Sequence, residues 1–259
     1  ALVGEQRVEH RLGIRGVLHG SQATGGAPPR ISCRAFLAMA RTATTPAEAP
    51  SAALGPLALA GSALFFASGF TGLAYEVLWF KKFAHVWGSS SLATAAVVGS
   101  FLLGLGLGAH FLGGLADRVK SPLAWYGKIE IVIAALALAI PFEIELVSAL
   151  SGRLYASFSG APLAHYFARL VLTFVVIGPP TILMGGTLPL MVRQFTTPGA
   201  GLRASAGWFY AVNTIGAATG CYVTGFHLLS RFGLSVTNYM TAASSFVIGL
   251  VSLAVARRI

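Results

Sequence analysis

A few ionisable and aromatic side chains stand inside long apolar runs of the sequence, where they could bind a charged substrate. Glu76 follows Tyr75 and precedes Trp79 in the run SGFTGLAYEVLWF. A carboxylate beside aromatic rings can hold an organic cation through charge attraction and cation–π contacts. We therefore consider Glu76, Tyr75 and Trp79 a candidate substrate-binding site for a cation, with an interfacial carboxylate as the alternative interpretation.

Three further polar residues stand in similar surroundings. Glu130, near Lys128, is either a second cation-binding carboxylate or a structural charge near a helix end. His110 lies among glycines and is either a hydrogen-bonded packing residue or a proton relay. Asn213 is expected to bond a neighbouring helix, with a substrate contact as the alternative. Ionisable groups enter a membrane at a cost of roughly 2.5–3.5 kcal/mol each, so every one of them requires an explanation.

The sequence lacks the spacings that are typical of catalytic or metal sites. We find no Ser–His–Asp order, no paired acid–base carboxylates and no metal-ligand spacing. The two cysteines, Cys33 and Cys221, form no C-x-x-C pair. We therefore expect no catalytic residues, no metal and no cofactor in this chain.

The composition predicts the elements that position these residues. The 259-residue chain is 55% hydrophobic and 10% charged, whereas soluble domains carry roughly 25% charged residues. Several uncharged runs exceed the ~20 apolar residues that cross a bilayer as a helix, and one further run has its charges at both ends, from where they can reach the interface. We predict an all-α, polytopic membrane protein with about six transmembrane helices, at about 56–80, 91–116, 122–146, 163–193, 204–229 and 235–256.

The first 50 residues differ from the rest of the chain. Residues 1–50 are rich in Arg, Pro and Ala and show no sustained apolar period, so we expect a disordered tail. Residues 51–259 then form the six-helix transmembrane domain. The run MARTATTPAEAP from Met39 is typical of a bacterial N-terminus, which predicts that translation naturally starts there and that residues 1–38 are an extension.

The distribution of Lys and Arg predicts the orientation in the membrane. The net charge of +10 is scattered between apolar runs, which favours a topology signal over nucleic-acid binding. With the N-terminus inside, most cations lie on the inner side, and the outer side carries Lys81, Lys82, Arg153, Arg169 and Arg231. The positive-inside rule thus predicts a bacterial-type inner membrane protein with both termini in the cytoplasm.

The run GLGLGAHFLGGLADRVK (residues 104–120) could be a phosphate-binding loop or a packed helix. A dinucleotide fingerprint needs a strand, a turn and a helix around its glycines, and the sequence here offers one uncharged run instead. Gly104 and Gly108 share one helix face, while Gly106, His110 and Gly114 form a second small or polar line. We expect these lines to let helices approach closely in lipid.

The run GPPTILMGGTLP is unusual for a membrane helix. Pro179 and Pro180 remove two amide donors in the middle of a predicted span, and Gly185, Gly186 and Pro189 loosen the next turns of the helix. Such breaks survive in lipid where neighbouring helices or a wet cavity satisfy the freed carbonyls. The alternatives are a static kink and a hinge or binding site of the kind found in transporters.

The run GGLADRVK resembles the loop signature G-x-x-x-D-R-x-x-R/K of the major facilitator superfamily, which lies between its second and third helices. Six helices are also half of that family's usual twelve. The resemblance implies a loop motif of Gly113, Asp117 and Arg118, in which the acidic residue pairs with neighbouring helix ends and biases the inward–outward equilibrium. The alternative is a cytoplasmic loop with a turn-forming Asp and positive-inside cations.

Four stretches together resemble the membrane region of fused MFS/spermidine-synthase-like proteins, namely SGFTGLAYEVLWFKKFAHVWGSS, LGLGAHFLGGLADR, GPPTILMGGTLPLMVRQF and GWFYAVNTIGAATGCYVTGFHLLSRFGL. That family commonly continues into an aminopropyltransferase-like domain, whose glycine loop and acidic cluster we do not find in this sequence. The resemblance implies a membrane domain that anchors, channels or transports a polyamine-type cation, and leaves enzymatic activity open. The alternatives are a half-transporter that acts as a homodimer and a purely structural subunit of a larger membrane complex.

Overall fold

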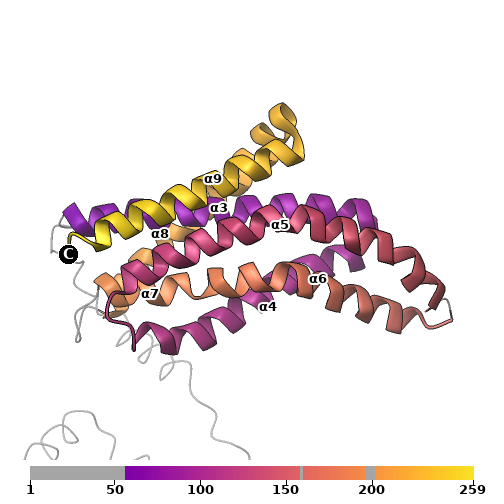
Figure 1. Cartoon of the computed structure of the whole chain (residues 1–259), viewed down its shortest axis with the longest axis horizontal. Helices are drawn as coiled ribbons and strands as arrows, with labels where there is room; N and C mark the ends of the chain where they lie inside the picture. The colour runs from indigo at the N-terminus through magenta and orange to yellow at the C-terminus, as the bar shows by residue number, and fades with distance from the viewer. Residues whose placement is uncertain (1–55, 158–159, 196–201) are drawn as a thin grey trace, which may run out of the picture. The chain divides into compact units, whose positions relative to one another are not determined.

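The computed structural model describes residues 56–157, 160–195 and 202–259, and all regular elements in these ranges are helices. The predicted tail at residues 1–50 and the predicted start at Met39 lie outside the described residues. Figure 1 shows the helices, which are α3 (Pro56–Trp87), α4 (Ser91–Ala116), α5 (Pro122–Ser157), α6 (Pro162–Gly185), α7 (Thr187–Phe195), α8 (Leu202–Val223), the π-helix η2 (Thr224–Leu228) and α9 (Leu229–Ala256).

The helices begin where the sequence provides a start signal. Pro122 and Pro162 are the first residues of α5 and α6, where the fixed φ of proline suits the first helical turn and no amide partner is lost. The Ser90 hydroxyl accepts a hydrogen bond from the Ala93 amide at 3.2 Å and caps α4. These signals place the helix starts close to the predicted ones.

Five helical stretches are long and apolar enough to cross a membrane, namely Pro56–Trp87, Ser91–Ala116, Pro122–Arg153, Leu163–Phe195 and Ser205–Ala256. This confirms the prediction of an all-helical chain with several membrane-spanning candidates. The last stretch has 52 residues, or about 78 Å at ~1.5 Å per residue, far more than a ~30 Å hydrocarbon core.

A backbone break divides this last stretch. Gly233 has φ 71° and ψ 177°, which no helix contains, and it follows the π-helix η2 closely. A positive φ of this size suits glycine, which has no Cβ to clash. In Figure 1 the chain reverses direction in this region, and α9 then returns along α3 and α5.

Three helix pairs make the largest contacts, namely α3 with α8, α4 with α6, and α5 with α9. In the α4–α6 pair, a Cβ added to Gly104 or Gly108 would overlap with Thr181 or the Ile182 carbonyl. In the α5–α9 pair two glycines face each other. A Cβ added to Gly127 would lie 2.8 Å from the Gly249 carbonyl oxygen, and a Cβ added to Gly249 would lie 2.7 Å from the Gly127 carbonyl oxygen. The predicted packing role of Gly104 and Gly108 is confirmed.

The second predicted line on α4 does not pack. A Cβ added to Gly106 or Gly114 would meet nothing within 4 Å, and His110 is exposed with its ring against Phe111, 5.0 Å between centroids. The interpretation of His110 as a packing residue is therefore wrong. Its line faces outward because α6 contacts the opposite face of α4, which carries Gly104 and Gly108.

The predicted break at Pro179 and Pro180 is also misplaced. Helix α6 continues through both prolines and ends at Gly185, and α7 begins two residues later. The Thr181 hydroxyl donates to the Ile177 and Gly178 carbonyls at 2.8 and 2.9 Å, which supports the backbone beside the prolines. Pro189 lies in the first turn of α7, where its missing amide costs little.

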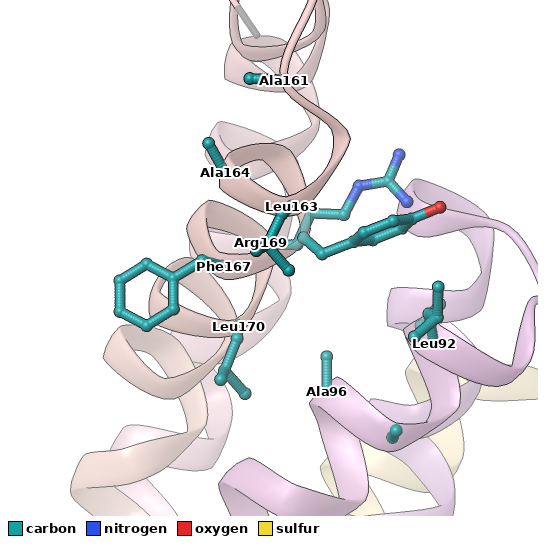
Figure 2. A pocket seen from close by; sticks show the side chains of 11 residues that line it. Leu92, Ala96, Ala161, Leu163, Ala164, Phe167, Arg169 and Leu170 are labelled. Carbon is teal, nitrogen blue, oxygen red and sulfur yellow. The ribbon is translucent and has the colours of Figure 1, made fainter.

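One groove opens between the first turns of α4 and α6. Its volume is about 840 Å³, and Figure 2 shows Leu92 and Ala96 of α4 across from Leu163 and Leu170 of α6. Phe167 also lines the groove. The groove thus lies at the end of the helix pair where α4 and α6 both begin.

Candidate functional site

The candidate site centres on Glu130, which the bundle buries almost completely. Its exposed fraction is 1%. Tyr126, one helical turn earlier on α5, is fully buried on the same face. The sequence predicts Glu130 beside Lys128, among charges that reach the interface, and the structure corrects this: Glu130 points into the bundle, whereas Lys128 is exposed and lies 5.0 Å from the Trp125 ring centroid.

Hydroxyl groups from three helices surround the Glu130 carboxyl group. The Ser68 hydroxyl of α3 donates to Oε1 of Glu130. The hydroxyls of Tyr126 on α5 and Ser245 on α9 lie close to the same carboxyl group, and the Tyr126 hydroxyl donates to the Leu64 carbonyl of α3 at 3.2 Å. Ser245 in turn accepts a hydrogen bond from the Tyr75 hydroxyl at 3.3 Å. The site therefore exists only where α3, α5 and α9 meet.

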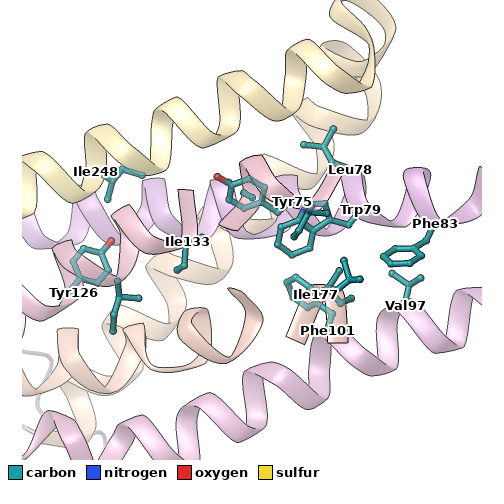
Figure 3. Packing of buried hydrophobic residues seen from close by; sticks show 14 of the residues in the cluster. Tyr75, Leu78, Trp79, Phe83, Val97, Phe101, Tyr126, Ile133, Ile177 and Ile248 are labelled. Carbon is teal, nitrogen blue, oxygen red and sulfur yellow. The ribbon is translucent and has the colours of Figure 1, made fainter. Parts of the chain in front are cut away.

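Aromatic rings close one side of this cluster. Tyr75 and Trp79 are buried and stack with 5.2 Å between centroids and 19° between planes. Figure 3 shows both rings on α3, with Tyr126 and Ile133 on α5 farther along the same interior. These rings exclude lipid and water, so that hydrogen bonds in the cluster act in a medium of low dielectric constant.

The neighbours of Glu130 are polar but uncharged. Within the described ranges the ion pair that we find joins Arg193 to Asp117, outside this cluster. A buried carboxylate without a partner charge is costly. Its hydroxyl neighbours offset part of that cost, and the group can still accept a proton or a cation. This is the chemistry that the arrangement can perform.

The structure does not bring Glu76, Tyr75 and Trp79 into one site. Tyr75 and Trp79 are four residues apart and share the inner face of α3. Glu76 is half-buried and lies about 100° around the helix from Tyr75, because successive residues do not face each other. The two rings accordingly belong to the surroundings of Glu130.

Asn213 lies where we predicted it. Its Nδ2 donates to the Phe65 carbonyl at 3.1 Å and joins α8 to α3, which confirms the expected interhelical hydrogen bond. Asn238 of α9 makes the corresponding contact with α5, donating to the Ala137 carbonyl at 3.0 Å. Both amides satisfy helix backbones inside the bundle.

The predicted loop motif lies at the opposite end of α4 from the groove. Asp117 follows α4, and its Oδ1 lies 3.7 Å from Nε of Arg193 on α7. Gly113 faces the same helix, since an added Cβ would lie 3.9 Å from Cγ of Pro189. Arg118 is exposed. Asp117 thus pairs with a neighbouring helix end, as the resemblance implies.

Sequence reasoning missed Ser68, Tyr126 and Ser245. Tyr126 and Glu130 are four residues apart on α5. Polar residues at such helical spacings indicate a shared face, so this signal was available for Tyr126.

No metal-binding group of three or more His, Cys, Asp or Glu side chains occurs in the part of the chain that the structure describes. Comparisons with protein-family models, with curated proteins and with solved structures find no match for this chain.

Proposed function

We propose that this chain is an integral membrane domain that binds a polyamine-type cation at Glu130 and anchors, channels or transports it. The observation that carries the proposal is the buried Glu130 carboxyl group, which has hydroxyl neighbours and no cationic partner among the described residues. A membrane protein retains such a costly group where it serves an ion or substrate pathway.

The helix arrangement supports a transporter-like domain. With the break at Gly233, the last apolar stretch can cross twice, which gives six crossings. The helices α3, α4 and α5 can be paired in order with α6, α8 and α9. If each helix is exchanged with its counterpart, the α3–α8 contact becomes the α4–α6 contact, and the α5–α9 contact is unchanged. The same exchange relates the α3–α9 contact to the α5–α6 contact. Such internal repeats are typical of secondary transporters.

The proposal includes the orientation and the membrane. Both termini would lie in the cytoplasm of a bacterial-type inner membrane, because the segments on that side, with the two terminal segments included, carry 13 of the 18 Lys and Arg residues. The resemblance to spermidine-synthase-like proteins supplies the substrate class, and a polycation fits a carboxyl group lined by hydroxyls and aromatic rings.

Binding of labelled spermidine to the purified, reconstituted protein tests this function. Glu130→Gln keeps the shape of the side chain and removes its charge, so we expect affinity to fall about tenfold or more. Glu145→Gln is the matched control, because Glu145 is exposed on the same helix. Equal binding by the wild type and Glu130→Gln would contradict the proposal. If binding does depend on Glu130, uptake into proteoliposomes distinguishes transport from anchoring.

A homodimer is the second candidate for the functional unit. Helix α4 has an open small-residue face, since added Cβ atoms on Gly99, Gly106 and Gly114 would meet nothing within 4 Å. Such a face can take the helix of a second copy in lipid. Native mass spectrometry in mild detergent should show dimers, and Gly106→Leu should reduce them. Monomers alone would exclude this candidate.

A further inference from the structure

The groove between α4 and α6 combines an apolar lining with one cation. Alanine and leucine side chains make up most of its wall, and its volume of about 840 Å³ lies in the range of small-molecule sites, about 300–1,000 Å³. Arg169 is the charged residue among those that line it. An apolar cavity with a single cation matches an amphiphile that has a negative head.

Arg169 is held in place but its charge is not neutralised. Its guanidinium carbon lies 5.1 Å from the ring centroid of Trp87, and its Nε is buried without a hydrogen-bond partner. No carboxylate lies within 4 Å of it in the ranges that the structure describes, where the ion pair is Arg193 with Asp117. A fixed guanidinium that no carboxylate neutralises is well suited to bind a phosphate.

The depth of Arg169 fits the position of a lipid phosphate. It lies six residues after Leu163, which begins an apolar stretch that could span a membrane, or about 9 Å along the helix axis. Figure 2 shows its side chain extending from α6 toward α4, back toward the start of α6. A long cationic side chain in this position reaches the headgroup region, and Trp87 is a typical interfacial residue.

We propose that this groove binds an anionic phospholipid of the surrounding bilayer, with its phosphate on Arg169 and an acyl chain against Leu92, Leu163 and Phe167. The positive charge disfavours a polyamine there, and the apolar lining disfavours a small soluble anion. The lipid also explains why a charged residue is retained in this apolar region. This inference requires a membrane but does not depend on the function of Glu130.

Native mass spectrometry with phosphatidylglycerol and phosphatidylcholine tests the lipid site. The wild type should bind the anionic lipid about tenfold more tightly, because phosphatidylcholine carries the same phosphate together with a positive choline group, which Arg169 repels. Arg169→Gln should abolish this preference and Arg169→Lys should keep most of it. Arg231→Gln is the matched control, because Arg231 is an exposed arginine that does not line the groove.

A second variant tests the apolar part of the groove. Ala95 is exposed and lines the groove, so Ala95→Trp should fill it without disturbing the core and should weaken binding of both lipids. If Arg169→Gln fails to fold, Arg169→Lys still tests the charge at the site, and Ala95→Trp still tests the apolar part of the groove.

Three results would overturn the inference. The first is an unchanged lipid preference in Arg169→Gln, or lipid binding that Ala95→Trp leaves unaltered. The second is displacement of the lipid by inorganic phosphate alone, which would indicate a site for a soluble anion. The third is a loss of dimers in Ala95→Trp without any change in lipid binding, which would indicate a second copy of the chain as the occupant.

Discussion

Helices come together in different ways at two places in the bundle, namely the α4–α6 contact and the meeting point of α3, α5 and α9. Between α4 and α6, side chains are absent at Gly104, Gly108 and Gly185, and the backbones touch. Around Glu130, polar side chains fill the interior and satisfy one another. Small residues stabilise helix contacts in lipid through close approach, whereas a buried carboxyl group carries a desolvation cost. The first region therefore serves the fold, and the second indicates a function.

The largest loss of stability should follow from adding a side chain at a glycine where α4 and α6 touch. In Gly108→Val the new atoms would overlap with the Ile182 backbone, which cannot move aside as a side chain can. We expect a loss of about 3 kcal/mol or more in unfolding free energy, seen as a lower thermal midpoint and a poor yield of monodisperse protein in detergent. Gly72→Val is the control, because a Cβ there meets nothing within 4 Å. Equal stability of the two variants would refute the close approach of α4 and α6.

An intermediate effect should follow from removing one hydroxyl of the cluster. Ser245→Ala deletes the acceptor for Tyr75 and a hydroxyl close to Glu130, so unfolding should become easier by about 1 kcal/mol and spermidine should bind about fivefold more weakly. The adjacent Ser244 is exposed and bonds to the Met240 carbonyl within its own helix. Should Ser244→Ala weaken binding as much as Ser245→Ala, the cluster would not be the binding site.

The smallest effect on stability should come from the ion pair of Asp117 and Arg193. The two side chains are 80% and 47% exposed, and their charged atoms are 3.7 Å apart. Asp117→Asn should therefore change the unfolding free energy by less than about 1 kcal/mol. Thermal unfolding at low and high salt measures this. A loss comparable to that of Gly108→Val would show that this contact supports the fold, contrary to our comparison.

The sequence was most informative where chemistry and spacing act together. Gly104 and Gly108, four residues apart, predicted a close helix contact, and Asn213 predicted a bond between helices. Both predictions are confirmed. Small residues allow helices to approach closely in lipid, and a polar side chain inside the bundle needs a hydrogen-bond partner. The positions of the long apolar helices followed from the absence of charges.

The burial of particular residues was harder to predict. Helices α4 and α5 are apolar on most sides, so periodicity does not distinguish a face in lipid from a face in the interior. His110 therefore faces outward, against the packing interpretation, and Glu130 lies inside the bundle and not among the interfacial charges. Ser68 and Ser245 gave no signal, because single serines occur on any face of a membrane helix, where their hydroxyls can bond to the preceding turn.

The most direct test of the central claim is infrared difference spectroscopy of the reconstituted protein with and without spermidine. If Glu130 binds the cation, spermidine should change a carboxyl stretching band that Glu130→Gln lacks and Glu145→Gln retains. A spermidine-induced carboxyl band that is identical in the wild type and Glu130→Gln would contradict the account.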